Sequence, residues 1–176
     1  MFKSAAAVLA LLTLLLFPMA SKAQLIPAGN LYAGAAYSSS EDVINRLSFR
    51  GFDGSAEAFP FHRYTYLGIV LDASGLFTKG VANTGTIQQY NAVLGPRISK
   101  NYGKWRIFAD AMGGYQITRS GGETYHSIAI DGGVGADRKL PFKNFSWRLQ
   151  FDYLHTHLLS ENQNEYRVST GIVWRF

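Results

Sequence analysis

The sequence predicts an all-β protein, an eight-stranded antiparallel up-and-down transmembrane β-barrel. Three observations support this prediction. Apolar and polar residues alternate in eight separate segments, which is the period of a strand with two unlike faces. The chain begins with an apolar leader, and the aromatic residues of one strand face gather at the strand ends. Together these patterns indicate an exported chain whose strands meet lipid on one side.

The first 23 residues have the pattern of a secretory signal peptide. Lys3 supplies a short positive region, residues 5–17 are apolar, and small Ser21 and Ala23 stand at the −3 and −1 positions before Gln24. The apolar run is short for a membrane span. We therefore expect a signal peptide over residues 1–23 and one barrel domain over residues 24–176. An uncleaved N-terminal anchor is the alternative.

Composition excludes several kinds of chemistry. The chain has no cysteine, so disulfides, thiolate metal sites, a cysteine nucleophile and lipid attachment to a cysteine after the leader are ruled out. The formal net charge is +5, and it falls to about +3 once Lys3 and Lys22 are removed. This balance is too mild to indicate a nucleic-acid partner. No segment after the leader has the run of about 18 apolar residues that a transmembrane helix needs.

The alternating segments follow one another without a linker or a second domain. They cover residues 31–38, 48–59, 64–76, 87–98, 105–118, 125–138, 145–157 and 165–176. Turn residues separate them, as in "RSGGE" and "LPFKN". Residues 42–47 could instead form a helical turn. The connections around 38–47, 77–86 and 158–164 are predicted to be the longer, outer loops, with compact turns at the other end, as in bacterial outer-membrane barrels.

One face of the segments carries aromatic residues at both ends and aliphatic residues between them. In "WRIFADAMGGYQIT", Trp105 and Tyr115 lie on the same face with Ile107 between them. Amphipathic rings prefer the two membrane interfaces, so this face is predicted to meet lipid. A soluble β-sandwich also alternates, but it gives no reason for this banding. The predicted aromatic girdles consist of Tyr37, Trp105, Tyr115, Trp147, Tyr153, Tyr166 and Trp174.

The opposite face is predicted to line a polar interior. Its charged residues are Asp53, Glu57, Asp72, Asp110, Asp131 and Asp152, together with Arg97, Arg106, Arg148, Arg167 and Arg175. Isolated charges in a narrow interior are costly, so these groups must pair or keep water. Eight strands enclose a space that side chains can fill. Six acids against five bases therefore predict a salt-bridged interior rather than a wide pore. Leakage of small ions is an alternative that the sequence does not exclude.

Three stretches resemble a known family. They are "YLGIVLDASG" (66–75), "RLQFDYLHTHL" (148–158) and "NQNEYRVSTGIVWRF" (162–176). The mature chain looks like the small outer-membrane β-barrel proteins related to the OmpA transmembrane domain, and particularly like short stand-alone versions from soil bacteria such as acidobacteria. The resemblance implies a location in the outer membrane among its lipids and lipopolysaccharide. It also implies that terminal Phe176 is part of the signal read by the outer-membrane assembly machinery. Cell-wall anchoring is not expected, because no peptidoglycan-binding domain follows the last strand.

The expected function is non-enzymatic service in envelope integrity, without a cofactor or metal. One alternative is adhesion or binding of an extracellular ligand through the outer loops. Another is a weak small-solute channel. A third is a lipid A hydrolase, for which the stretch "HTHLLSENQNE" offers His155, His157, Ser160 and Glu161. Its spacing departs from the deacylase pattern, in which histidine and serine are one residue apart on a strand. His155 and His157 could also form a two-histidine metal site, but zinc normally needs three or four protein ligands.

Overall fold

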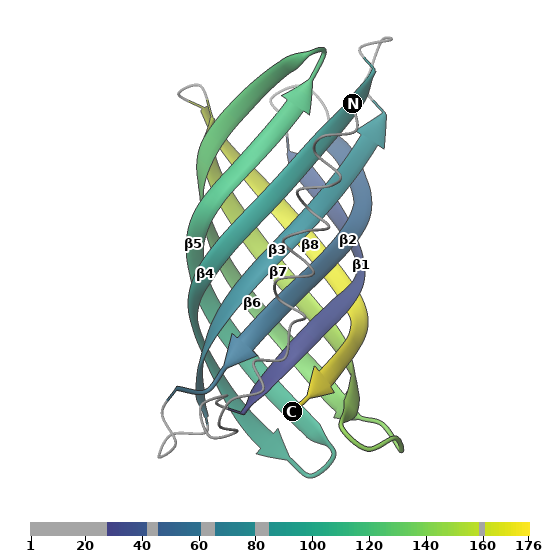
Figure 1. Ribbon diagram of the computed structural model, residues 1–176. Coiled ribbons are helices and arrows are strands. Elements are labelled where there is room, and N and C mark those ends of the chain that lie inside the picture. Colours follow the sequence, from purple (N-terminus) through teal and green to yellow (C-terminus); the bar gives the residue numbers. More distant parts are fainter. Residues whose placement is uncertain (1–27, 42–45, 61–65, 80–84, 159–160) are drawn as a thin grey trace, which may run out of the picture.

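The protein is a closed β-barrel of eight strands, which confirms the predicted fold class (Figure 1). The computed structural model describes residues 28–41, 46–60, 66–79, 85–158 and 161–176. The predicted signal peptide lies outside the described residues. Each strand pairs antiparallel with the next along the chain, and β1 pairs with β8 to close the barrel. No helix among the described residues is long and apolar enough to cross a membrane.

All strands except β3 are longer than the alternating segments indicated, and β3 has the expected length but starts three residues later. They are β1 (Gly29–Glu41), β2 (Arg46–Ala58), β3 (Leu67–Lys79), β4 (Thr86–Tyr102), β5 (Trp105–Ser120), β6 (Glu123–Lys139), β7 (Phe145–Leu158) and β8 (Glu161–Arg175). We call the end where β1 begins and β8 ends the lower end, as drawn in Figure 1. Backbone hydrogen bonds in both directions between Gly29 and Phe176 hold the two termini of the barrel together there.

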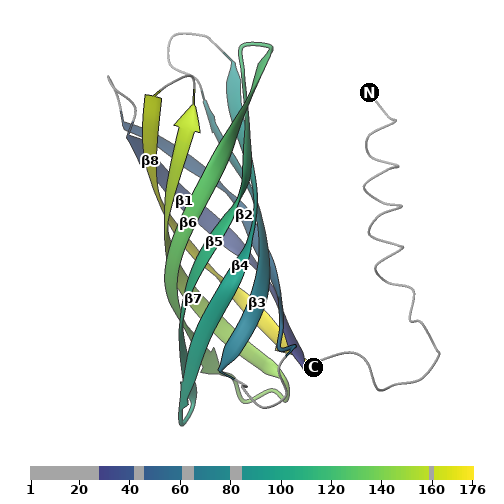
Figure 2. The ribbon, with the colours of Figure 1, turned by 90° about the vertical axis from the view of Figure 1, so that its left-hand side faces the viewer.

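The pairing register sets the tilt of the strands. Following paired residues once around the barrel from Asn30 leads to Ser40, ten residues further along β1. With usual strand spacings, this shift corresponds to a tilt of about 40°. Figures 1 and 2 show the strands crossing the barrel obliquely. A barrel of this size has an interior that side chains fill.

The connections differ from those expected. The upper connections span residues 42–45, 80–85, 121–122 and 159–160, whereas the lower ones span 59–66, 103–104 and 140–144. The prediction of longer upper loops and compact lower turns was therefore wrong, because the polar residues beyond the upper aromatics continue the strands. A strand extension satisfies their backbone N–H and C=O groups without requiring apolar side chains. The helical turn proposed for 42–47 was wrong for Arg46 and Leu47, which belong to β2, while residues 42–45 lie outside the described residues.

The upper turn between β5 and β6 shows how local sequence fixes the pairing. Gly121 and Gly122 both have positive φ, at 59° and 92°. A two-residue hairpin with positive φ at both positions matches the right-handed twist of the strands, and glycine adopts it without strain. The flanking Ser120 and Glu123 are therefore held in register.

Candidate functional site

The outer surface carries exposed aromatic side chains toward both ends of the barrel and exposed aliphatic side chains between them. All seven aromatic residues predicted for the girdles lie exposed on the outside of the barrel. The three tryptophans are near the lower end and the four tyrosines near the upper end, as the strand directions require. Exposed aliphatic side chains fill the band between them, namely Ile69, Leu71, Leu94, Ile107, Ile130, Val134, Leu149 and Val168. Such a large apolar area on one molecule indicates a surface that is covered by another apolar phase.

The inward side chains form ion pairs near the lower end. Arg148 contacts Asp137 through two hydrogen bonds, Nε to Oδ1 at 2.7 Å and Nη2 to Oδ2 at 3.1 Å. Arg106 donates from Nη1 and Nη2 to the carboxylate of Glu57, at 2.9 Å and 2.5 Å. The five charged side chains Glu57, Arg106, Asp137, Arg148 and partly exposed Arg175 make up what we call the lower network.

Two further charged side chains lie above the lower network. Arg97 is paired with Asp110, with Nε to Oδ2 at 2.7 Å and Nη2 to Oδ2 at 2.6 Å. The centroid of the Phe108 ring lies close to two guanidinium groups, 4.2 Å from that of Arg97 and 4.6 Å from that of Arg148. Stacking on an aromatic face suits arginine because its guanidinium is planar and weakly hydrated. The ring therefore attracts both positive charges.

A second group of charges, the central cluster, lies midway along the barrel. Arg167 contacts Asp72 and Asp131 from Nη2, both at 3.1 Å, and Asp152 from Nε at 3.0 Å. Its Nη1 donates to the hydroxyl of Ser74 at 2.8 Å. Asp53 belongs to the same cluster, because it pairs in register with Ser74, the residue whose hydroxyl accepts from Arg167. Asp53 is 2% exposed, and neither of its carboxylate oxygens has a hydrogen-bond partner among the described residues.

The structure places ten of the eleven predicted interior charges in buried positions, and Arg175 is half-buried at the lower rim. Two acids were missed. Asp137 holds Arg148, and Glu165 accepts hydrogen bonds from Ser38 Oγ at 2.5 Å and from Gln89 Nε2. The alternation of the sequence indicates both, because residues two apart in a strand lie on the same face. Asp137 therefore shares the inward face of Gly133 and Gly135. Glu165 likewise shares the parity of Arg167.

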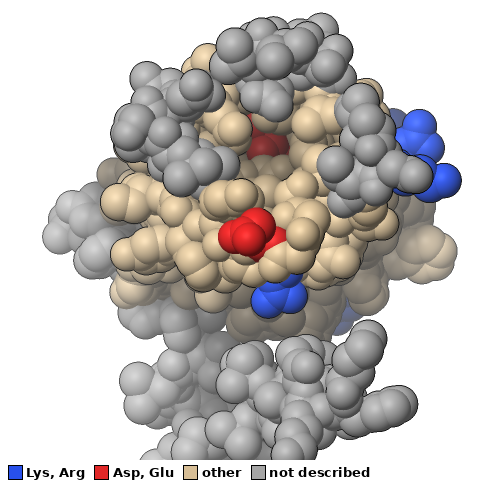
Figure 3. All heavy atoms as spheres, turned by 90° about the horizontal axis from the view of Figure 1, so that it is seen from above, with Lys and Arg blue, Asp and Glu red and all other residues tan. Residues whose placement is uncertain are grey.

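The described interior is consequently acidic rather than nearly neutral. It buries eight acidic side chains against four fully buried arginines. The surplus is concentrated in the central cluster, where four aspartates share one arginine, whereas the lower network is close to balance. Figure 3 looks into the upper end, where acidic atoms are visible inside the opening and most other described atoms belong to uncharged residues.

The interior is packed shut at the level of these charges. The side chains of Arg97 and Arg167 have no accessible surface, that of Arg148 is 1% exposed, and those of Asp72 and Asp152 are likewise buried. The other inward positions hold polar amides and hydroxyls, or apolar side chains such as those of Val70, Val93 and Met112. Buried groups do not line a water-filled channel, so the described interior is closed at this level.

The histidine-rich stretch is only partly described. His155 Nδ1 lies 2.9 Å from Asn164 Oδ1, so this amide and the ring hold each other at the upper end of β7. The side chains of His157 and Glu161, and all of Ser160, lie outside the described residues. Among the residues that are described, no group of three or more histidine or acidic side chains is arranged to hold a metal ion. The hydrolase and metal hypotheses therefore gain no geometry from the structure.

Solved structures share this fold. Neisserial surface protein A superposes with a TM-score of 0.72 at 13% identity, covering 84% of this chain and 97% of that one. Ail, the attachment invasion locus protein of Yersinia pestis, gives 0.60 at 16% identity, covering 86% and 100%. Ail in complex with the heparin analogue sucrose octasulfate gives 0.55 at 15% identity, covering 85% and 99%. No family model and no curated protein matches the sequence.

These neighbours are small eight-stranded outer-membrane barrels. The chain therefore has the fold of that class of protein, and the resemblance to OmpA-like barrels is confirmed at the level of the fold.

Proposed function

We propose that the chain is an integral outer-membrane protein with a solid interior and a structural role in the cell envelope. The observation that carries this proposal is the pairing of an apolar, girdled exterior with an interior closed by buried ion pairs. An exterior of this kind is stable only in lipid. In this proposal residues 1–23 are the signal peptide, removed on export, and the lower end faces the periplasm. The partners of the protein are outer-membrane lipid and lipopolysaccharide.

The end of the chain supports recognition by the outer-membrane assembly machinery. Phe176 is 46% exposed, and its ring lies 5.3 Å from that of Trp174. Two exposed aromatic rings at the lower end of β8 form a surface that an assembly factor can bind before the barrel closes. The backbone hydrogen bonds of Phe176 to Gly29 form when β8 meets β1, so they complete the closure.

The alternatives have less support. A channel needs accessible inward side chains, and those of the central cluster are sealed. Binding through long outer loops loses its structural basis, because the upper connections are short. An attachment role like the one in the name of Ail would instead use the exposed upper strand ends, where Arg50, Lys79 and Arg119 are available. A lipid A hydrolase would require His155 to act on a nucleophile within hydrogen-bond reach, and its described contact is with Asn164.

Three experiments test the proposal. The purified protein should need detergent to stay in solution, and it should run faster on a gel before boiling than after. Protein that is soluble without detergent and shows no heat-dependent shift would refute the membrane location. Deletion of the gene should sensitise cells to detergents, and the parent gene should restore resistance. Planar-bilayer recordings should show no steady conductance above that of the lipid alone, and a steady conductance would favour the channel.

A further inference from the structure

We infer that the lower end of the barrel carries a binding site for an anionic phospholipid of the periplasmic leaflet. The inference rests on the proposed function, because it needs the barrel to sit in a membrane with this end at the inner leaflet. The site is formed by a basic group of side chains around Arg138 and by an apolar groove directly above it on β6.

Charge at the lower exterior has one sign. The exposed basic side chains there are Lys100, Lys104, Arg138, Lys139 and Lys143. Among the residues whose side chains are described, no acidic side chain lies on the outer surface of this end, because the acids are either buried in the interior or at the upper end. Each Lys or Arg near an anionic membrane surface favours binding by about fivefold. A row of uncompensated cations at lipid headgroup depth thus suits a phosphate.

Arg138 has the most defined setting. Its position on β6 lies directly between Trp105 of β5 and Trp147 of β7 in the pairing register, and all three side chains are exposed on the outside. The guanidinium carbon is 5.5 Å from the centroid of the Trp105 ring. Indole rings prefer the membrane interface, so they fix the depth at which this guanidinium meets headgroups. Arginine also binds phosphate in a bidentate fashion.

A cleft between two lower turns completes the headgroup site. It is lined by Gly103, Lys104, Arg138, Lys139, Leu140, Pro141 and Trp147. The backbone N–H of Lys139 donates to the carbonyl of Lys104 at 2.8 Å, which fixes the β4–β5 turn against the end of β6. Three cations, one from the β4–β5 turn and two from the end of β6, therefore line one cleft.

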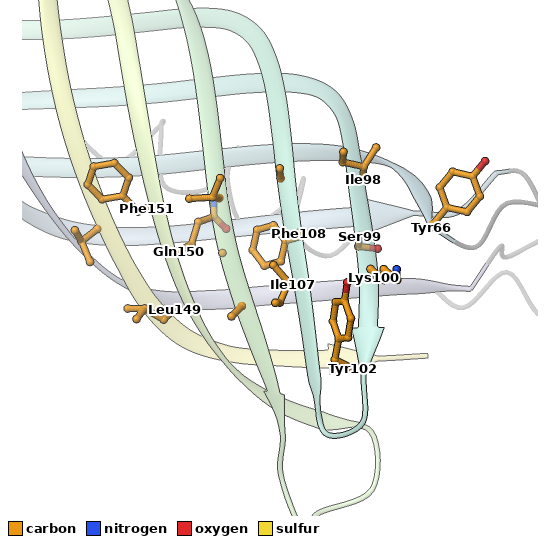
Figure 4. Close-up of a pocket in the computed structure, with 15 residues that line it drawn as sticks. Tyr66, Ile98, Ser99, Lys100, Tyr102, Ile107, Phe108, Leu149, Gln150 and Phe151 are labelled. Atoms are coloured by element: carbon orange, nitrogen blue, oxygen red, sulfur yellow. The ribbon is translucent and has the colours of Figure 1, made fainter.

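The groove for an acyl chain begins directly above. Two residues up β6 from Arg138, the small side chain of Ala136 lies between Ile107 and Leu149 on the neighbouring strands. Higher still, Val134 lies between Ala109 and Phe151. These residues line an apolar depression, which also includes Lys100 and Tyr102 near the rim (Figure 4). A phospholipid whose acyl chain occupies this groove has its phosphate at the level of Arg138. A free phosphate ion would need only the cleft and would make no use of the groove.

The test uses the tryptophans of the protein, all three of which lie near this end. The full-length mature protein is refolded into phosphatidylcholine vesicles that contain a small fraction of phosphatidylglycerol brominated on its acyl chains, or the same fraction of brominated phosphatidylcholine. Bromine quenches tryptophan fluorescence only on close approach. We expect the brominated phosphatidylglycerol to quench at least about fivefold more effectively per molecule, as one Lys or Arg contact would give.

The variant Lys104→Gln/Arg138→Gln/Lys139→Gln should lose this preference. A matched control, Arg50→Gln/Lys79→Gln/Arg119→Gln, removes as many charges from the upper end and should keep it. The heat-dependent gel shift verifies that both variants are folded. Retention of the preference in the lower variant would overturn the site.

The remaining outcomes separate the site from the proposed function. Equal quenching by the two brominated lipids would overturn the phospholipid site and leave the membrane location intact. Quenching by neither lipid would show that the tryptophans do not contact lipid, and the proposed function would fail with the site. Excess soluble glycerol 1-phosphate should not reduce the preference, and competition by it would assign the cleft to a soluble phosphate instead.

Discussion

Replacing Asp53 by asparagine should stabilise the barrel, although the side chain is buried and charged. Asp53 is 2% exposed, and both of its oxygens lack a hydrogen-bond partner among the described residues. Its charge is repelled by those of Asp72 and Asp152 and attracted by that of Arg167. Arg167 is already shared by three aspartates. The carboxylate of Asp53 is therefore desolvated by burial, and no ion pair of its own offsets that cost.

The size of the effect follows from the register. Asp53 pairs with Ser74, so Asp72 is its diagonal neighbour across the β2–β3 ladder, at about 7 Å. At that separation and an effective dielectric constant of about 20, the repulsion is about 2 kcal/mol. The attraction by Arg167 and the repulsion from Asp152 act in opposite senses on this charge. Asparagine keeps the volume and removes this charge. We expect a gain of about 1–3 kcal/mol in the free energy of unfolding.

The assay is urea-induced unfolding in lipid vesicles, followed by tryptophan fluorescence and by gel mobility. The matched control is Asp137→Asn, which makes the same chemical change in an aspartate that accepts two hydrogen bonds from Arg148. Breaking that buried pair should lower the free energy of unfolding by about 3–5 kcal/mol. The two substitutions thus have opposite predicted signs. If Asp53→Asn destabilised the barrel as Asp137→Asn does, the reasoning from the acidic surplus would be refuted.

Two further substitutions test the interior packing and the outer surface. Gly133→Ala should destabilise the barrel by about 1–3 kcal/mol, because the added Cβ would fall against the carboxylates of Asp110 and Asp152. The control is Gly132→Ala, whose added Cβ would meet no atom within 4 Å, so it should change the unfolding midpoint little. Equal effects of the two substitutions would contradict the close packing of carboxylates around Gly133. Ile130→Arg puts a charge in the outward apolar band and should cost about 2–4 kcal/mol in bilayers. A cost below about 1 kcal/mol would argue against lipid at this position.

The sequence predicted the strand number, the two faces and most interior charges, because strand periodicity alone assigns a residue to one side. Asp137 and Glu165 were missed because they lie at the ends of their predicted segments. The assignment of alternate residues to the inward face was not extended to those ends. The length of the strands was underestimated for a related reason. Beyond the upper girdle both faces are polar, so alternation fades while backbone pairing continues.

Other features depend on closure, which no single segment encodes. The shift of ten residues around the barrel decides that Arg167 of β8 meets Asp72 of β3 and Asp131 of β6 across the interior. The isolation of Asp53 likewise follows from this three-dimensional arrangement. The setting of Arg138 between two tryptophans follows from two registers at once, so the lower basic site became visible only in the structure.

The lipid-facing exterior can be tested most directly by site-directed spin labelling, since the chain has no cysteine of its own. Labels would be placed singly at outward Leu149 and, for comparison, at outward Lys79 beyond the upper girdle. In vesicles, the label at Leu149 should collide frequently with oxygen and rarely with a water-soluble nickel complex, while the label at Lys79 should show the reverse. Frequent collision of the nickel complex with the label at Leu149 would mean that water covers the apolar band, and the membrane barrel would be contradicted.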